Sequence, residues 1–313
     1  MLTGSWWHSL MVEASILLLT KNEARNIGAC LEAIYAQKNA LEFEVVVVDS
    51  GSTDETMEIA TRYPVRLEKV RPEEFHHART RNLAAELARG QYLVYLAADA
   101  LPASSEWLEA LLADFADAGV AAVYGRHIPK AGSTPEREDT LGAVYGKERL
   151  VKDPFRGQEM GYRYFHFSTV NAAIRKDVWD KTRFPEDLKC FEDLGIAKRI
   201  LDSGAKIVYE PRAAVFHSHN HTQRGLFKRY FDAGVIWRRL GIWNEQTRKS
   251  MLGDMGGLLR KKLRRIRENN HGRPVGMSMR QDVAKAFGLL LGLNERYIPV
   301  SVKRHFSAIG LYE

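Results

Sequence analysis

Short apolar runs alternate with amphipathic segments along the chain from Ala14 onward. Apolar runs rich in valine, leucine and isoleucine are typical of buried strands, and we predict strands at residues 14–20, 42–50, 65–70, 91–99 and 120–128. Segments with apolar positions three or four residues apart are typical of helices, and we predict helices at 22–37, 77–89 and 104–119. We predict a further helix that begins after Ser52 or Thr53, one of which would be its cap. This alternation predicts an α/β fold with a doubly wound, mostly parallel sheet.

The chain is less regular after residue 128. Residues 129–168 read as a long irregular insertion, and such insertions are usually functional or mobile. We predict a strand, a turn and the start of a helix in 167–180, a helix at 191–204 that ends at Gly204, and a pair of strands in 205–219.

A basic helical appendage is expected to follow the α/β domain. Beyond Thr222 the pattern becomes helical, strongly basic and interrupted by glycines. We therefore expect an N-terminal extension at 1–13, an α/β domain at 14–222 and a basic helical region at 223–313.

Charge separates the same parts of the chain. Residues 1–210 carry 26 basic and 32 acidic side chains, whereas residues 211–313 carry 20 basic and 7 acidic ones, a net charge of +13. This excess predicts an anionic partner such as phospholipid headgroups, nucleic acid or a phosphorylated substrate. The alternative is a solvated basic face.

Composition excludes several classes of protein. With 45% apolar and 27% charged residues among 313, the chain is neither disordered nor collagen-like. Its two cysteines, Cys30 and Cys190, cannot build a disulfide framework. Apolar runs stay well short of the roughly 18 to 20 residues of a membrane span, and the first residues lack the pattern of a secretory signal. We expect a cytoplasmic protein that can still lie on a membrane.

Polar residues at the carboxyl ends of the predicted strands are the first candidates for a site, because ligands bind there in such sheets. In VVVVDSGSTDET, Asp49 ends a strand and Gly51 permits a tight turn. The Asp49 carboxylate can accept the imide N–H of uracil or thymine, with Ser50 beside it. The alternative is an aspartate that caps the next helix.

A second candidate is a metal site. Asp99 follows another predicted strand, and one carboxylate together with phosphates and water suits Mg²⁺ or Mn²⁺. A turn-capping role is the alternative. In HSHNH, His217, His219 and His221 alternate, so on a strand they would point to one side. One histidine that serves a metal on Asp99 fits better than a separate three-histidine site.

A third candidate combines acids and arginines at helix starts. Glu192 and Asp193 begin a predicted helix, and a general base requires only one of them to face the substrate. The alternative is two acids stabilised by the helix dipole. In HHARTRNLA, Arg79, Arg81 and Asn82 open another helix, which suits diphosphate recognition or simply a solvated basic turn.

Taken together and in this order, these segments resemble the family 2 inverting glycosyltransferases of the GT-A fold, and among them the bacterial rhamnosyltransferase-like branch. The resemblance rests on LLLTKNEARNI, VVVVDSGSTDET, FHHARTRNLAAELARGQYLVYLAADALP, FEDLGIAKRIL and VFHSH. It covers about residues 14–222 and continues more weakly through FKRYFDAGVIW and GLNERYIPVSVKRHFS. It implies that 14–222 is a nucleotide-sugar-binding catalytic domain.

The resemblance also implies roles for the candidate residues. Thr20, Glu23 and Asp49 would bind the nucleotide, with Asp49 on the base. Asp99 matches the metal-binding acid of the family's Asp-x-Asp-like motif. Because Ala97 and Ala98 stand where many relatives have further acids, Mg²⁺ or Mn²⁺ would rest on one carboxylate and the donor diphosphate.

The implied reaction is a single displacement that inverts the anomeric configuration. Asp193 matches the catalytic base that takes a proton from the acceptor hydroxyl, while Glu192 belongs to the donor site. Mg²⁺ and Arg81 would stabilise the charge on the departing nucleoside diphosphate. His217 or His219 would approach the metal or the diphosphate.

We therefore predict transfer of L-rhamnose from dTDP-rhamnose to a lipid-linked or polysaccharide acceptor in cell-surface glycan synthesis. The alternatives are a transferase that uses a UDP- or GDP-sugar, a nucleic-acid-binding protein and a nucleotide-binding protein without turnover. The segment GLLRKKLRRIRENN places Leu259, Leu263 and Ile266 on one face of a basic amphipathic helix. This helix would hold the protein at the inner face of the membrane, or else pack against the core.

Overall fold

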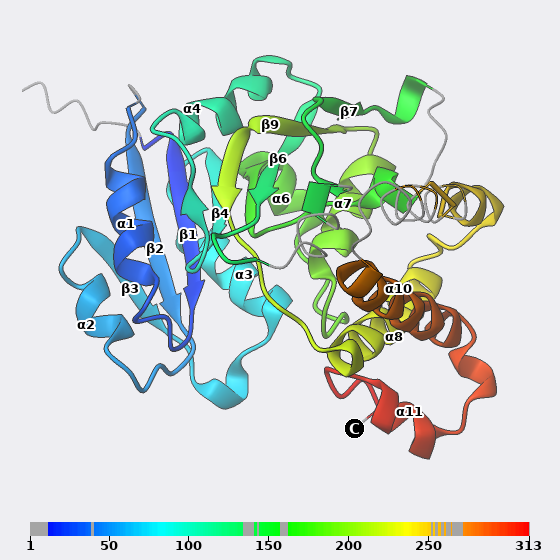
Figure 1. Ribbon diagram of the computed structural model, residues 1–313. Coiled ribbons are helices and arrows are strands. Elements are labelled where there is room, and N and C mark those ends of the chain that lie inside the picture. Colours follow the sequence, from blue (N-terminus) through cyan, green and yellow to red (C-terminus); the bar gives the residue numbers. More distant parts are fainter. Residues whose placement is uncertain are drawn as a thin grey trace, which may run out of the picture.

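The computed structural model describes residues 12–38, 41–133, 141–142, 144–156, 162–251 and 272–312, together with residues 253, 256, 257, 260 and 264. A nine-stranded sheet forms its centre, in the order β3-β2-β1-β4-β8-β6-β9-β5, with β7 paired to β9 (Figure 1). The strands are β1 (Ala14–Thr20), β2 (Phe43–Asp49), β3 (Val65–Lys69), β4 (Tyr92–Ala97), β5 (Leu101–Pro102), β6 (Val120–Ile128), β7 (Leu150–Lys152), β8 (Asn171–Arg175) and β9 (Lys206–Phe216).

Most strands of the sheet run in one direction. Strands β1, β2, β3, β4, β6 and β9 share this direction, and β5, β7 and β8 oppose it. The chain adds β2 and β3 on one side of β1 and then returns to place β4 on the other. A ligand site is expected beyond the carboxyl ends of β1 and β4, where the winding reverses. The predicted fold class is confirmed.

Helices cover both faces of the sheet. They are α1 (Ile27–Tyr35), α2 (Thr56–Ala60), α3 (His77–Leu87), α4 (Trp107–Leu112), α6 (Lys176–Thr182) and α7 (Glu192–Asp202). Side chains of α1, α2 and α4 pack on one face, and those of α3, α6 and α7 on the other. Adjacent residues therefore face different cores: Val45 and Val47 lie in one, Val46 and Val48 in the other. Burial on both sides explains why these strands are continuously apolar.

The turns after β1 and β2 differ from the prediction. Helix α1 begins at Ile27, because Asn22 has a left-handed backbone (φ 55°) and does not cap a helix. Helix α2 begins at Thr56, because Asp49 accepts hydrogen bonds from the amide and hydroxyl of Ser52. Thr53 donates its amide to Asn22 Oδ1. Neither Ser52 nor Thr53 therefore caps the helix.

Three later segments also differ from the prediction. The helix expected at 104–119 is α4 followed by a 3₁₀ turn at Ala113–Ala116. The pair of strands expected in 205–219 is the single strand β9, which ends before His217. The insertion at 129–168 contains the short strand β7.

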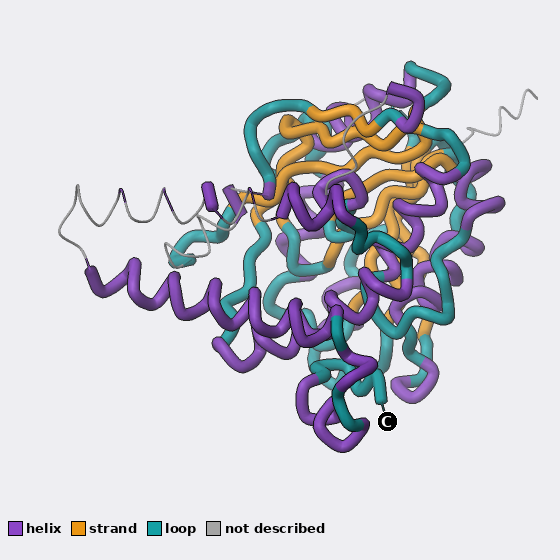
Figure 2. Tube along the Cα trace, turned by 90° about the vertical axis from the view of Figure 1, so that its right-hand side faces the viewer, coloured by secondary structure: helices purple, strands orange, loops and turns teal. Residues whose placement is uncertain are grey.

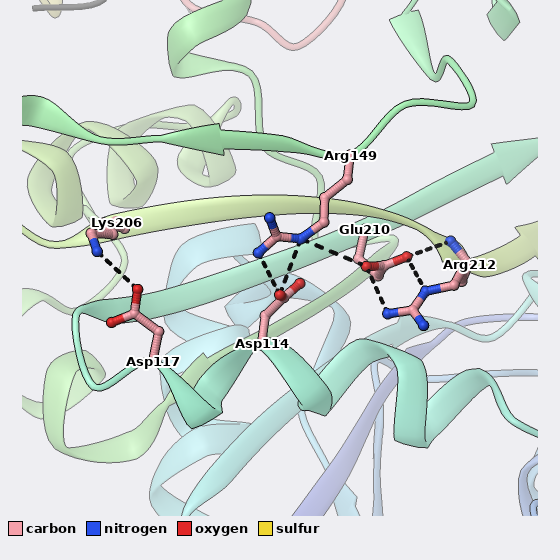
Figure 3. A network of polar contacts seen from close by, with 6 residues as sticks. All are labelled: Asp114, Asp117, Arg149, Lys206, Glu210 and Arg212. Carbon is pink, nitrogen blue, oxygen red and sulfur yellow. Dashed lines mark hydrogen bonds and ion pairs between the residues drawn. The ribbon is translucent and has the colours of Figure 1, made fainter. Parts of the chain in front are cut away.

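Ion pairs attach β7 to the rest of the sheet (Figure 3). Arg149, next to β7, contacts Asp114 at 2.6 Å and Glu210 of β9 at 3.9 Å. The same network contains the pairs Arg212–Glu210 and Lys206–Asp117. The insertion is therefore anchored at this point.

A bundle of helices follows the sheet. It consists of α8 (Gln223–Arg239), α10 (Gly272–Leu293) and α11 (Val300–Phe306), and Figure 2 shows the long helix α10 extending beyond the sheet layer. Thr222 caps α8 through the amide of Gly225, at the predicted boundary. The division into domains stays a prediction. The basic segment 258–267 lies outside the described residues apart from Arg260 and Arg264, as does the extension 1–13 apart from residues 12 and 13.

Helices α8 and α10 meet at their backbones. A Cβ atom on Gly288 would lie 2.3 Å from the carbonyl oxygen of Phe227, and one on Gly292 would lie 2.0 Å from that of Phe231. Only glycine fits at such an approach. The four-residue spacing of Gly288 and Gly292 places both on the face of α10 that contacts α8.

Candidate active site

The turn after β2 holds Asp49 firmly. Its Oδ2 atom accepts the amides of Gly51 and Ser52, each at 2.9 Å, and its Oδ1 atom accepts the Ser52 hydroxyl. Asp49 therefore stabilises its own turn and does not cap the next helix, which begins at Thr56, and one lone pair of Oδ1 is not used by these bonds. Its contact with a nucleobase stays a prediction.

The end of β1 lies beside that of β2. Thr20 pairs with Asp49 in the parallel register, and the amide of Ser50 donates to the Thr20 carbonyl at 3.0 Å. The Thr20 Oγ1 atom is buried without a hydrogen-bond partner among the described residues. A buried hydroxyl normally finds a partner. This atom fits the predicted ligand site.

Glu23 belongs to the loop that faces this turn. Its amide donates to Thr56 Oγ1 at 2.7 Å, and its carboxylate accepts from Asn26 Nδ2 at 2.6 Å. These bonds tie the loop after β1 to the loop after β2. Glu23 therefore lies in the wall of the predicted nucleotide site, and its contact with the nucleotide stays a prediction.

Asp99, His217 and His219 come together as predicted for a metal site. His217 Nε2 lies 3.5 Å from Asp99 Oδ1, and His219 Nε2 lies 3.3 Å from Asp99 Oδ2. One potential ligand atom from each residue lies within 4.8 Å of the others. No other such group of acids, histidines and cysteines occurs in the part of the chain that the structure describes.

Short pairing between strands explains this meeting. Leu101 of β5 pairs with Phe216 of β9, so the segment after β4 lies against the end of β9. The His217 amide donates to the Ile128 carbonyl at 2.9 Å, which fixes His217 at the end of β6. The histidines are therefore grouped by neighbouring strand ends, although they do not themselves lie on a strand.

The ligand types of this trio fit a divalent cation. One carboxylate and two imidazoles can bind a divalent transition-metal ion such as Mn²⁺, whereas Mg²⁺ prefers oxygen ligands. Lys130, which sequence reasoning missed, lies 3.7 Å from Asp99 Oδ2. It follows β6, so the rule that ligands bind at strand ends could have indicated it. Its ammonium group would compete with a cation for Asp99.

The two acids at the start of α7 have different contacts. Glu192 is buried and pairs with Arg81 Nη1 at 2.8 Å. Asp193 accepts the amide of Leu194 at 2.8 Å, and none of the ion pairs described involves it. Phe191 precedes them with a left-handed backbone (φ 57°). Of the two acids, Asp193 thus keeps the freer carboxylate.

The environment of Asp193 suits proton transfer. Burial, followed by the charge of Glu192, raises the pKa of Asp193 to about 7, while Arg81 and Arg229 act in the opposite direction. A general base works best when its pKa lies near the working pH. Arg229 belongs to α8, so the helical bundle contributes charge to this site; sequence reasoning missed it.

The three polar residues near the start of α3 have different roles. Arg81 Nε donates to Thr169 Oγ1 at 3.0 Å in addition to the pair with Glu192, so Arg81 lies with the two acids of α7. Its contact with a diphosphate stays a prediction. Asn82 is structural, because its buried amide group bonds Phe184, Glu186 and Trp179. Arg79 is exposed.

A buried cluster of aromatic and imidazole rings extends from the metal site. The His127 ring stacks on Tyr145 at 4.1 Å and meets the His217 ring at 5.5 Å. Tyr145 also bonds His166 Nε2 at 3.1 Å. Beyond it Lys152 is buried, donates to the His166 carbonyl, and has a pKa well below its usual range because of burial.

Comparison with known proteins supports the same picture. The model of Glycosyl transferase family 2 matches residues 15–183. The O-antigen chain rhamnosyltransferase WbaN of Salmonella anatum is 32% identical over 273 residues, which cover 86% of this chain and 85% of that protein. RfbN of Salmonella typhimurium, an O-antigen chain rhamnosyltransferase as well, is 28% identical and covers 96% of each chain.

Solved structures show the same fold. The mannosyltransferase PcManGT from Pyrobaculum calidifontis, in complex with GDP-Man and Mn²⁺, has a TM-score of 0.56 at 19% identity, covering 96% of this chain and 84% of that one. S. aureus TarS 1–349 in complex with UDP-GlcNAc has a TM-score of 0.56 at 17% identity, covering 93% and 82%. With the match of the family model, these similarities confirm the prediction of an enzyme: the chain is a glycosyltransferase and belongs to Glycosyl transferase family 2.

Proposed function

We propose that this glycosyltransferase moves L-rhamnose from dTDP-L-rhamnose to a lipid-linked or polysaccharide acceptor in cell-surface glycan synthesis. The choice of rhamnose as the donor sugar is supported by the similarity, over most of the chain, to two O-antigen chain rhamnosyltransferases. The net charge of +13 in residues 211–313 supports an acceptor or a membrane surface that carries negative charge.

In this proposal the acceptor hydroxyl loses its proton to Asp193. The acceptor oxygen attacks the anomeric carbon, the bond to the diphosphate breaks, and the configuration inverts in one displacement. The pKa of about 7 allows Asp193 to be ionised before the attack and to accept the proton during it. Glu192 holds Arg81 beside the reacting groups through their 2.8 Å pair.

The donor diphosphate lies, in this proposal, between the ends of β1, β4 and β9. Asp99, His217 and His219 would hold Mg²⁺ or Mn²⁺, which when bound neutralises charge on the diphosphate. Lys130, 3.7 Å from Asp99, can move to a phosphate oxygen when it leaves the carboxylate. Thr20 and Asp49 would contact the nucleoside, as the resemblance implies.

Transfer from a panel of donors tests this proposal. The enzyme is incubated with dTDP-L-rhamnose, UDP-GlcNAc or GDP-mannose, Mn²⁺ and a diphosphate-linked glycan, and product and free nucleotide are measured. We expect transfer with dTDP-L-rhamnose and an anomeric configuration in the product opposite to that of the donor. A preference for another nucleotide-sugar would contradict the proposed donor.

The variant Asp193→Asn tests the base. It should lower transfer by about 10² to 10⁴-fold while donor binding is retained, since the amide keeps the shape but cannot accept the proton. The matched control is Asp202→Asn at the other end of the same helix, where Asp202 pairs with Lys198 at the surface. Near-normal transfer by Asp193→Asn would assign the base to another residue.

We also propose that the enzyme works at the inner face of the cell membrane. None of the helices that the structure describes combines the length and the apolar character needed to cross a bilayer. The predicted amphipathic helix at 258–267 supports attachment to an anionic surface. Changing Lys261, Lys262, Arg264 and Arg265 to Ser should weaken this attachment and spare transfer to a short water-soluble acceptor.

A further inference from the structure

Helix α10 carries apolar side chains on two of its faces. One face, with Gly288, Leu289 and Gly292, is buried against α8. On a second face, which borders the groove between α8 and α10, Val283, Phe287 and Leu290 are exposed, by 67%, 57% and 50%. Spacings of four and three residues place these side chains in one stripe. The stripe has no partner among the described residues of this chain that buries it.

The apolar surface continues beyond this stripe. Tyr297 is 71% exposed, and Val300 and Val302 of α11 are exposed as well. A groove of about 470 Å³ between α8 and α10 adds the side chain of Phe227. Six of the ten large apolar side chains exposed in the described part of the chain lie between 283 and 302. Such a concentration indicates a binding surface.

Charge around this surface identifies the partner. Residues 272–312 hold six basic and two acidic residues. Both acids are neutralised within the protein, Asp282 by Lys285 at 3.6 Å and Glu295 by Arg238 and Lys303. The arginines beside the apolar side chains, Arg280, Arg296 and Arg304, are exposed.

An anionic bilayer complements this combination better than a second copy of the chain does. Two copies meeting through the stripe would bring like-charged arginines together, which costs free energy. A bilayer surface instead offers phosphate groups to the arginines and acyl chains to the apolar side chains. An exposed tyrosine such as Tyr297 is typical of the level of the headgroups.

We propose that the α10–α11 face, defined by Val283, Phe287, Leu290, Tyr297 and Val300, lies in the headgroup region of an anionic membrane. This deepens the proposed membrane location by naming the surface that binds. Helix α8, on which α10 packs, begins at Gln223, shortly after His217 and His219. Docking would therefore bring the candidate metal site close to acceptors carried by the same membrane.

Sedimentation with vesicles tests the proposal without donor or acceptor, so its outcome is independent of the transfer reaction. We expect the wild type to bind vesicles of phosphatidylcholine with 30% phosphatidylglycerol, and to bind pure phosphatidylcholine at least tenfold more weakly. The triple variant Val283→Ser, Phe287→Ser, Leu290→Ser should lose at least tenfold in affinity. The matched control is Phe155→Ser, because Phe155 is 81% exposed but lies outside this face, next to β7.

A second pair of variants keeps the proposal testable if the triple variant does not fold. Phe287→Trp should be quenched by brominated acyl chains more than wild type is, and Phe155→Trp should not. Binding that is unchanged in the triple variant, absent in the wild type or equal for both lipids would overturn the proposal. A wild-type dimer that the triple variant dissociates would assign the face to a second copy instead.

Discussion

Replacing Glu192 by Gln should shift the pH dependence of transfer to lower pH. The carboxylate of Glu192 is one of the two causes that raise the pKa of Asp193, the other being burial. The same carboxylate holds Arg81 at 2.8 Å. The variant removes a negative charge and also releases the positive charge of Arg81. Both changes favour the ionised form of Asp193.

The size of this shift follows from simple electrostatics. A like charge about 6 to 10 Å away, at an effective dielectric constant of about 20, contributes roughly 1.7 to 2.8 kcal/mol, or about 1 to 2 pKa units. The pKa of Asp193, about 7 in the wild type, should therefore fall to about 5 to 6 in Glu192→Gln. Burial is unchanged, so the pKa stays above its ordinary value.

The assay is kcat/KM for transfer to a water-soluble acceptor between pH 4.5 and 9. The rate should rise with pH, because the base acts when ionised, with a midpoint near the pKa of the free enzyme. We expect the midpoint near pH 7 for wild type and one to two units lower for Glu192→Gln. Arg81→Gln should move the midpoint the other way.

Two results would refute this reasoning. An unchanged midpoint in Glu192→Gln would mean that the rise with pH does not report Asp193. An inactive Glu192→Gln together with an active Asp193→Asn would assign the base to Glu192.

Stability offers a check that does not require turnover. The folded-state pKa of Asp193 is raised. Its contribution to the free energy of unfolding is therefore full below pH 3.8 and is lost as the pH rises to about 7. Asp193→Asn should therefore unfold at a higher temperature than wild type at pH 8, and the difference should vanish near pH 4.

Three further changes test other parts of the molecule. Asp99→Ala should weaken Mn²⁺ binding in the presence of dTDP, measured by calorimetry, and identical dTDP affinity with EDTA and with Mn²⁺ would contradict a metal site at Asp99. Lys152→Met should raise stability at pH 7 in urea unfolding, because burial disfavours the charged form of the wild-type side chain. The folded-state pKa of Lys152 is lowered, so the stability of the wild type should rise with pH up to about 10.5. A Lys152→Met variant that is less stable than the wild type would show that the charged lysine is well accommodated. Gly292→Ala should cost about 1 to 3 kcal/mol, since its Cβ would meet the Phe231 carbonyl at 2.0 Å, and an unchanged unfolding midpoint would mean that α10 can move away from α8.

The sequence predicts those parts of the fold that local pattern controls. Strands β1, β2, β4 and β6 are apolar because both faces of the sheet are covered, and their positions were predicted closely. The cap predicted for the helix after β2, Ser52 or Thr53, is wrong. Ser52 could bond either the next helix or Asp49, and the competition is decided by the geometry of the turn.

In the candidate site, too, local sequence pattern predicts some residues and tertiary contacts decide the others. Asp99 and the histidines could be located because each follows a strand, and strand ends meet at one edge of the sheet. The choice between Glu192 and Asp193 depends on Arg81, which is distant in sequence, so spacing could not decide it. Lys130 and Arg229 lie outside the five principal motifs, Lys130 just after a strand and Arg229 in the segment where the resemblance is weaker. The α10–α11 face could not be recognised, because an apolar helix does not reveal which of its sides is covered.

The glycine contacts between α8 and α10 have a mechanical consequence. Helices that meet through side chains can slide when those side chains change rotamer, but here carbonyl groups of α8 fit against Gly288 and Gly292. The two helices must then turn and translate as one lever. Any tilt imposed on α10 from outside therefore reaches the start of α8 at Gln223, close in sequence to His217, which is fixed to the sheet at the end of β6. The height of the sugar-transfer site above a surface would thus be set by backbone geometry, and acceptors of matching length would be favoured.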